Sequence, residues 1–192
     1  MAYTSRWNGY EERTLLGCGV YPIKQSPKSG SSVGPAPALD PTAVNEETGQ
    51  EEPQDDLLDE ALQYFKPHML FRTYKIKGNA DRLTLYLTSF IHTCLKRLVG
   101  VTKDKAKGVL TLLAQESPIA PCESTYPFHQ FFPAPTSPAE VEQWKEYAKQ
   151  LRLEMVVRVA EKAYQFPEAD GTPNKFWLIF AKQGLLGQTS GK

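Results

Sequence analysis

The chain has 192 residues, of which 41% are hydrophobic, and 22 basic and 22 acidic residues give it a formal net charge of zero. This size supports one domain that buries roughly 70% of its unfolded surface, and three cysteines without CxxC spacing indicate neither a disulfide scaffold nor a zinc site. A net charge of zero argues against a protein dedicated to binding nucleic acids or membranes. Because the sequence contains neither a membrane-spanning apolar run nor a signal core, we expect a soluble cytosolic protein.

The charges are segregated along the chain. From Ala38 to Phe65 there are nine acidic residues and no lysine or arginine, whereas from Lys66 to Ala114 there are ten basic and two acidic residues. Two interpretations remain open. The segments are either neighbouring solvated regions of opposite sign, or the basic one is a docking surface for an acidic partner.

The N-terminal third predicts extended chain followed by a linker. Leu15 to Ile23 contains two glycines and a proline, which favours an extended segment packed on the core over a helix. Residues 26–54 are rich in proline, glycine, serine and acidic residues, and they have too few large apolar side chains to order themselves. We predict an extended N-terminal segment (1–25), a flexible linker (26–54), a helical domain (55–186) and a flexible tail (187–192).

The first helix is predicted to begin near Asp55. Acidic residues in its first turn suit the positive end of the helix dipole. Pro67 should end or kink this helix, and from Met69 to Ile76 the pattern does not distinguish helix from extended chain. The apolar stripe of the helix consists of Leu57, Leu58, Ala61, Leu62 and Phe65.

The segment from Asn79 to Val99 is the most informative one. Asn79 is predicted to be its N-cap, and Gly100 is placed to terminate it. On a helical wheel its apolar side chains cover about 260° of arc. A helix of this kind must be enclosed by others, which predicts an all-α, single-domain bundle of about five helices with this helix at the centre. The narrow polar strip consists of Ser89, Thr93 and Lys96.

Two further helices and an ordered loop are predicted after it. A helix should run from Thr102 to Gln115, and the irregular loop from Pro118 to Pro138 should be pinned by its aromatic residues. Ser137-Pro138-Ala139-Glu140 is a capping box with proline at the first helical position. The helix that it starts should reach about Tyr164 and carries apolar stripes on two opposite sides. The aromatic residues of the loop are Tyr126, Phe128, Phe131 and Phe132.

The C-terminal region repeats the cap-plus-proline signal at Thr172-Pro173-Asn174-Lys175. Phe176 to Ala181 is apolar on all sides, and Gly184 is placed to end the helix. Such a concentrated patch is more often core than interface. Since only part of it can face inward, both interpretations remain open.

Candidate catalytic residues do not assemble into a known pattern. Cys122 and His129 are the one close Cys and His pair outside a helix, and their spacing matches no catalytic signature. His92 and Cys94 point about 200° apart on one helix; we expect Cys94 in the core and His92 to be a hydrogen-bonded structural histidine. No cofactor or metal site is predicted.

Single-stranded nucleic-acid binding by a helical module remains an alternative function. Basic and aromatic residues alternate before the central helix, as in proteins that hold the backbone and stack on bases. No RNA- or DNA-reading motif accompanies them. These residues are Phe71, Arg72, Tyr74, Lys75, Lys77 and Arg82.

Six segments stand out by their order and spacing: DLLDEALQYFK (56–66), FRTYKIK (71–77), LYLT (85–88), CLKRL (94–98), QLRLE (150–154) and GTPNKFW (171–177). Together they resemble the family of actin-related protein 2/3 complex subunit 3. The similarity covers most of residues 3–21 and 34–183. The chain departs from the family in its longer, more acidic stretch from Gln25 to Pro53, at Pro67, and from Gly184 to Lys192.

The resemblance implies a small all-helical fold and a non-catalytic subunit of the assembly that nucleates branched actin filaments. The implied partners are the other subunits of that complex, chiefly the larger actin-related protein, and the actin filament, in the cytoplasm and the actin-rich cortex. We expect the basic region to provide long-range attraction and the aromatic C-terminal helix to provide a buried anchor. The candidate interface residues are Arg72, Lys75, Lys77, Lys175, Phe176, Trp177 and Lys182.

Overall fold

The computed structural model describes residues 3–10, 13–26, 34–39, 55–70 and 75–185. The α-helices of this part are α1 (Leu57–Leu70), α2 (Asn79–Arg97), α3 (Lys103–Gln115), α4 (Pro138–Ala163) and the short α5 (Lys175–Leu178). Three 3-10 helices accompany them, η1 (Arg6–Gly9), η2 (His129–Phe131) and η3 (Ile179–Lys182). One small antiparallel sheet pairs β1 (Thr14–Leu15) with β2 (Cys18–Gly19), so that Leu15 lies opposite Cys18. The prediction of an all-α fold is confirmed.

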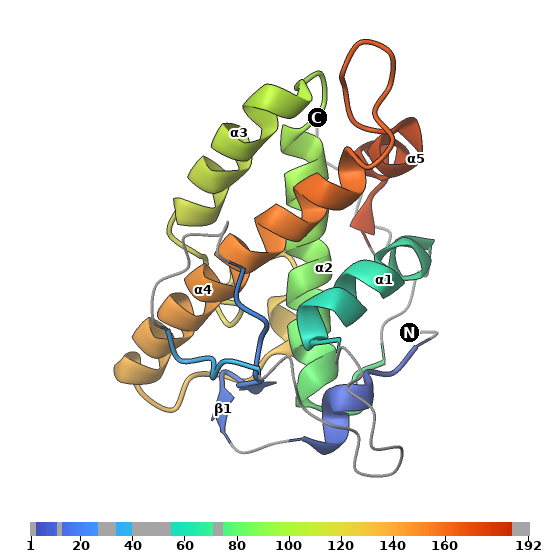
Figure 1. The fold of residues 1–192 in the computed structure, drawn as a ribbon. Coiled ribbons are helices and arrows are strands. Elements are labelled where there is room, and N and C mark those ends of the chain that lie inside the picture. Colours follow the sequence, from blue (N-terminus) through green and yellow to red (C-terminus); the bar gives the residue numbers. More distant parts are fainter. Residues whose placement is uncertain (1–2, 11–12, 27–33, 40–54, 71–74, 186–192) are drawn as a thin grey trace, which may run out of the picture.

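Helix α2 lies at the centre of the molecule. Helices α1, α3 and α4, the sheet and η3 all pack against it (Figure 1). Leu83, Leu87 and Ile91 lie along one face of α2 and Leu85 points to nearly the opposite side, yet none of the four has any exposed surface. The predicted polar strip lies half-buried or exposed. The prediction of one enclosed helix is therefore confirmed, although Val99 follows the end of the helix and is exposed.

The N-terminus of α2 is capped by a residue from elsewhere in the chain. Asn79 is the first helical residue and Gly78 is the N-cap, so the prediction that Asn79 caps the helix is wrong. Instead, Asn8 Oδ1 accepts hydrogen bonds from the backbone N–H groups of Ala80 (3.1 Å) and Asp81 (3.2 Å). At the other end Gly100 has a φ of 73°, a left-handed conformation that favours glycine and ends the helix as predicted.

Helix α1 does not end at Pro67. Proline removes one backbone hydrogen bond from a helix interior, but only three residues follow it before the helix ends at Leu70. His68 and Met69 in this last turn are both buried, and their packing holds the turn in place.

Helix α4 begins as predicted, and its buried polar side chains bind the N-terminal segment. Ser137 Oγ accepts a hydrogen bond from the Glu140 N–H (3.2 Å), whereas the Glu140 carboxylate accepts from the N–H groups of Leu16 (2.7 Å) and Thr136 (2.7 Å). Further along, the buried Gln150 accepts from the Ala36 N–H (2.9 Å). Three more residues of α4 bind the same segment: Tyr147 contacts Gly19 and Tyr21, Glu154 contacts Ser26, and Arg158 contacts Lys24.

The N-terminal segment is extended across the helices. Thr14 to Ile23 contains both strands, and Ile23 forms a parallel bridge with Ala38. Residues 34–39 of the predicted linker thus contact the bundle, and 27–33 and 40–54 lie outside the described residues. Most of the aromatic residues predicted to pin the loop after α3 are buried, namely Tyr126, Phe128 and Phe132.

Candidate partner interface around the C-terminal helix

The C-terminal apolar segment folds as two short helical turns. Asn174 is the N-cap of α5, and its side chain accepts a hydrogen bond from the Phe176 N–H (2.8 Å). Helix α5 ends at Leu178 and continues directly as η3. The apolar side chains of these two turns point in two directions, some toward the core and others toward the surface.

The inner side of this segment belongs to the core. Phe180 and Ala181 are buried. The Phe65 ring of α1 contacts two aromatic rings of this segment. Phe180 lies edge-on to it with the ring centroids 5.7 Å apart, and Trp177 stacks on it with the centroids 6.0 Å apart. His92 of α2 is buried, and burial lowers the pKa of its imidazole. Its Nε2 atom has no hydrogen-bond partner among the described residues, so the burial expected of a structural histidine is observed and the hydrogen bond expected at that nitrogen is not.

The outer side of the segment is a small exposed apolar surface. Phe176 is 67% exposed and Ile179 is 56% exposed. Phe166 is also exposed, and its carbonyl accepts a hydrogen bond from the Asn174 side chain (3.1 Å). We call Phe166, Phe176 and Ile179 the outer aromatic surface. The two interpretations of the C-terminal patch therefore apply to different residues, since one side is core and the other is open.

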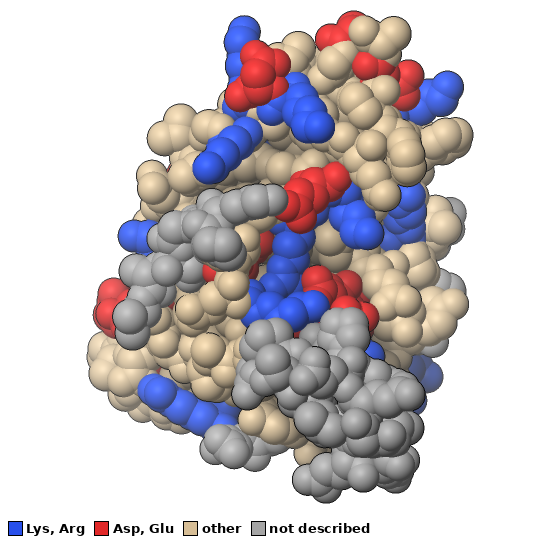
Figure 2. Space-filling view, viewed as in Figure 1, with Lys and Arg blue, Asp and Glu red and all other residues tan. Residues whose placement is uncertain are grey.

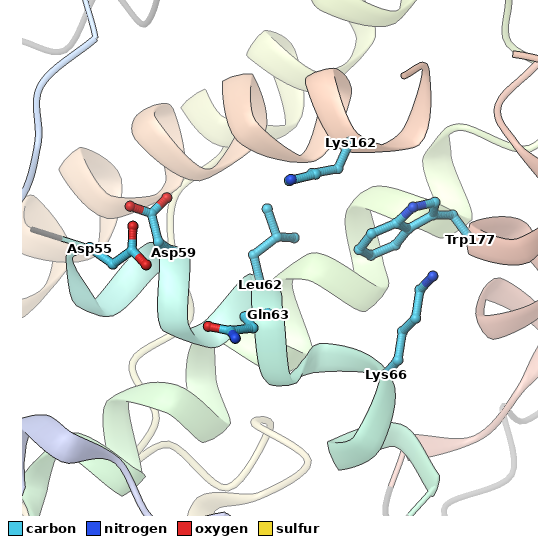
Figure 3. A pocket seen from close by; sticks show the side chains of 7 residues that line it. All are labelled: Asp55, Asp59, Leu62, Gln63, Lys66, Lys162 and Trp177. Carbon is cyan, nitrogen blue, oxygen red and sulfur yellow. The ribbon is translucent and has the colours of Figure 1, made fainter. Parts of the chain in front are cut away.

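A groove of about 450 Å³ lies between α1, α4 and α5. Figure 3 shows that α1 forms one wall, that Lys162 reaches over it from α4, and that the Trp177 indole closes the end near α5. The residues that line it are Asp55, Asp59, Leu62, Gln63, Lys66, Lys162 and Trp177. We call it the α1–α4 groove.

The acidic end of this groove is neutralised by ion pairs. Arg158 of α4 donates to Asp56 Oδ2 (2.7 Å) and to Asp59 (2.9 Å), and Lys24 pairs with both Asp59 and Asp55. Asp56 has no exposed surface. Burial alone would raise the pKa of the Asp56 carboxyl, but the hydrogen bonds and charge of Arg158 outweigh burial and hold that pKa below its usual value.

The basic end of the groove holds two lysines that have no ionic partner among the described residues. The Lys66 ammonium lies 4.4 Å from the centre of the Trp177 ring, a cation–π contact. Neither Lys66 nor Lys162 forms a salt bridge with any residue that the structure describes. Leu62 between them is almost fully buried, so this end combines two free positive charges with an apolar floor.

The structure places the candidate interface residues in two separate regions. Lys175, Phe176, Trp177 and Lys182 belong to α5 and η3, which pack near His92. Lys75 and Lys77 are exposed and precede the start of α2, and His92 lies about 20 Å further along that helix. Arg72 lies outside the described residues.

Basic side chains do not form one continuous area on the visible face of the molecule. In Figure 2, lysine and arginine side chains alternate with acidic ones on the face that carries α1 and α4. An expectation of a single basic surface therefore does not hold on this face.

Of the seven groove residues, only Trp177 was among the candidate interface residues predicted from the sequence. The sequence does contain a signal for the groove residues of α1, because their spacing of three or four places them on one helical face. These residues are Asp55, Asp59, Leu62, Gln63 and Lys66. Lys162 could not be added in this way, since its position depends on how α4 crosses α1.

The cysteines lack the features of a nucleophile. Cys94 is buried, and burial strongly raises the pKa of its thiol. Cys122 is half-buried, and burial likewise raises its thiol pKa, whereas reactive cysteines have a lowered one. Among the described residues, no three His, Cys, Asp or Glu side chains lie close enough to hold a metal ion. In the same part of the chain, no helix has the length and apolar character needed to cross a bilayer.

Comparison with known proteins identifies the family of this chain. Residues 1–189 match the family described as the ARP2/3 complex ARPC3 (21 kDa) subunit. The chain belongs to this family. It is 32% identical to actin-related protein 2/3 complex subunit 3 of Dictyostelium discoideum, with 98% of this chain and 99% of that protein covered.

Other ARPC3 relatives support the assignment. The subunit 3 of Arabidopsis thaliana is 36% identical, with 97% of each chain covered. A probable subunit 3 of Caenorhabditis elegans is 38% identical over 144 residues, which are 70% of this chain and 76% of that protein. The resemblance noted in the six sequence segments is confirmed, and the protein is a member of a family of complex subunits.

Proposed function

We propose that this protein is a non-catalytic structural subunit of the actin-related protein 2/3 complex, and that it contributes to actin nucleation and to branched filament formation. The observation that carries the proposal is the family match over residues 1–189, nearly the whole chain. We place the protein in the cytoplasm, with the cytoskeleton of the actin-rich cortex.

The proposed contacts are with the larger actin-related protein and with the mother filament. The outer aromatic surface supports the first contact, because exposed aromatic side chains that become buried typically dominate interface energies. Trp177 connects this surface to α1 through its stack on Phe65. The exposed Lys75, Lys77, Lys175 and Lys182, together with Arg72, would attract acidic actin-like surfaces over longer distances.

Co-purification tests this proposal. The tagged chain, expressed with the other subunits of the complex, should elute with them in a 1:1 ratio. Branch formation by the assembled complex should then exceed that of a complex assembled without this chain. A chain that elutes alone would contradict the proposal. A salt-dependent shift of single-stranded oligonucleotides by the lone chain would instead favour the nucleic-acid-binding alternative.

A further inference from the structure

The two ends of the α1–α4 groove differ in their charge balance. At one end, Lys24 and Arg158 pair with the acidic residues around Asp59. At the other end, Lys66 and Lys162 have no acidic partner in the described chain. The groove therefore presents a net positive charge at the end where it meets α5.

The positive end also has a shape and an apolar lining suited to a bound side chain. Figure 3 shows Lys162 extended from α4 toward Leu62, and Lys66 rising from α1 toward the Trp177 indole. Both ammonium groups border the groove from different helices, that of Lys162 near Leu62 and that of Lys66 beside the Trp177 ring. Trp177 and Leu62 form apolar surface directly beside them. Such a site fits a carboxylate carried next to an apolar side chain.

We propose that the α1–α4 groove receives an acidic segment of a neighbouring subunit, with one or more carboxylates between Lys66 and Lys162 and an apolar side chain against Trp177. This inference rests on the proposed function, since it assumes that the protein is assembled with other subunits. Charge complementarity selects the occupant, because a basic or neutral segment would leave both ammonium groups unpaired.

Charge reversal tests the groove. The variant Lys66→Glu with Lys162→Glu should bind the remaining subunits roughly tenfold more weakly than the unchanged chain does, because attraction becomes repulsion. The matched control is Lys149→Glu with Arg13→Glu, which changes the net charge equally at exposed positions outside both the groove and the basic segment 66–114. Equal binding by the two variants would overturn the inference.

A neutral variant separates binding from folding. Lys66→Gln with Lys162→Gln removes the charges without introducing repulsion, and circular dichroism and the thermal midpoint report whether the chain remains folded. A folded neutral variant should bind the other subunits with a weaker dependence on salt than the unchanged chain. An unchanged salt dependence would contradict a role for these two charges.

Crosslinking identifies the occupant directly. The photoreactive residue p-benzoylphenylalanine, placed at the exposed groove position Gln63 in the assembled complex, should crosslink to a segment of another subunit that contains Asp or Glu. A crosslink to residues 40–54 of this chain, a crosslink to a segment without acidic residues, or no crosslink would overturn the inference while leaving the proposed function intact. Failure of the unchanged chain to assemble would instead overturn the proposed function.

Discussion

Arg158 and Asp56 form the most buried ion pair of the described chain. Arg158 also donates to the Lys24 carbonyl (2.9 Å), so this side chain connects α4, α1 and the N-terminal segment. Asp56 in turn accepts from the backbone N–H groups of Lys24 (2.8 Å) and Asp59 (2.9 Å). Because both carboxylate oxygens of Asp56 and both terminal nitrogens of Arg158 have partners, the removal of one partner affects several others.

Asp56→Asn should destabilise the protein by about 3 kcal/mol, since it leaves the charge of the largely buried Arg158 without its main partner. Urea unfolding followed by circular dichroism measures this loss. Asp55→Asn is the control, because the Asp55 side chain is exposed and its ion pair with Lys24 contributes at most about 1 kcal/mol. Equal midpoints for the two variants would contradict the assigned role of the buried pair.

His68 makes stability depend on pH in the weakly acidic range. Burial lowers the pKa of His68 to about 4 from its usual 6.5, although a hydrogen bond with the Tyr3 backbone raises it somewhat. The unfolded chain therefore binds a proton between pH 6.5 and 4 that the folded protein does not bind. Stability contributed by neutral His68 is present above pH 6.5 and is lost as the pH falls toward 4.

The thermal midpoint of the unchanged protein should fall between pH 6.5 and pH 4, and it should fall less in His68→Gln, which has no proton to gain. Differential scanning calorimetry at a series of pH values measures both slopes. Identical slopes would show that another group causes the acid sensitivity.

At the scale of elements, the N-terminus of a helix is capped either by its own N-cap side chain or by a side chain from a distant segment. Helix α4 uses its own Ser137, α5 uses its own Asn174, and α2 uses Asn8 from the N-terminal segment. Local capping signals therefore predicted the start of α4 correctly and misplaced the cap of α2. The difference arises because Gly78 has no side chain to accept a hydrogen bond.

Ser137→Ala should cost about 1 kcal/mol of unfolding free energy, because the Glu140 N–H loses its acceptor at the start of α4. Ser137→Thr retains a hydroxyl in the same place and should cost less. Chemical denaturation of the two variants compares them. A Thr variant as unstable as the Ala variant would argue against a capping role for the hydroxyl.

At the scale of the whole molecule, the outer aromatic surface is an apolar area that the core does not bury. Most of the large apolar side chains of the described chain pack into one continuous core, whereas Phe176 and Ile179 remain mostly exposed. Trp177 belongs to both regions, because it stacks on Phe65 and lines the groove. Trp177→Ala is therefore expected to lower both the thermal midpoint and the incorporation into the complex.

Phe176→Ser with Ile179→Ser should reduce incorporation into the complex at least tenfold while leaving the thermal midpoint of the lone chain nearly unchanged, because exposed side chains contribute little to folding. Pull-down of the other subunits and a thermal melt measure the two effects. Leu112→Ser on α3 is the control, since Leu112 is equally exposed at 68% but lies far along the chain from α5. Normal incorporation of the double variant would contradict an anchoring role.

Much of the architecture was predictable because it depends on short-range patterns. The nearly all-round apolar wheel of 79–99 requires neighbours on every side, whatever those neighbours are, and the Ser137 cap acts within three residues. The ordered set of six segments likewise identified the family without any knowledge of contacts.

Other features depended on how distant segments meet, and no local pattern could predict them. Asn8 reaches Ala80, Arg158 reaches Asp56, and Lys162 reaches the face of α1 only because the chain folds back on itself. The same holds for the division of 176–181 into buried and exposed side chains, since a fully apolar run does not specify which side meets the core. Propensity and capping act over a few residues, whereas burial and ion pairing are properties of the packed chain.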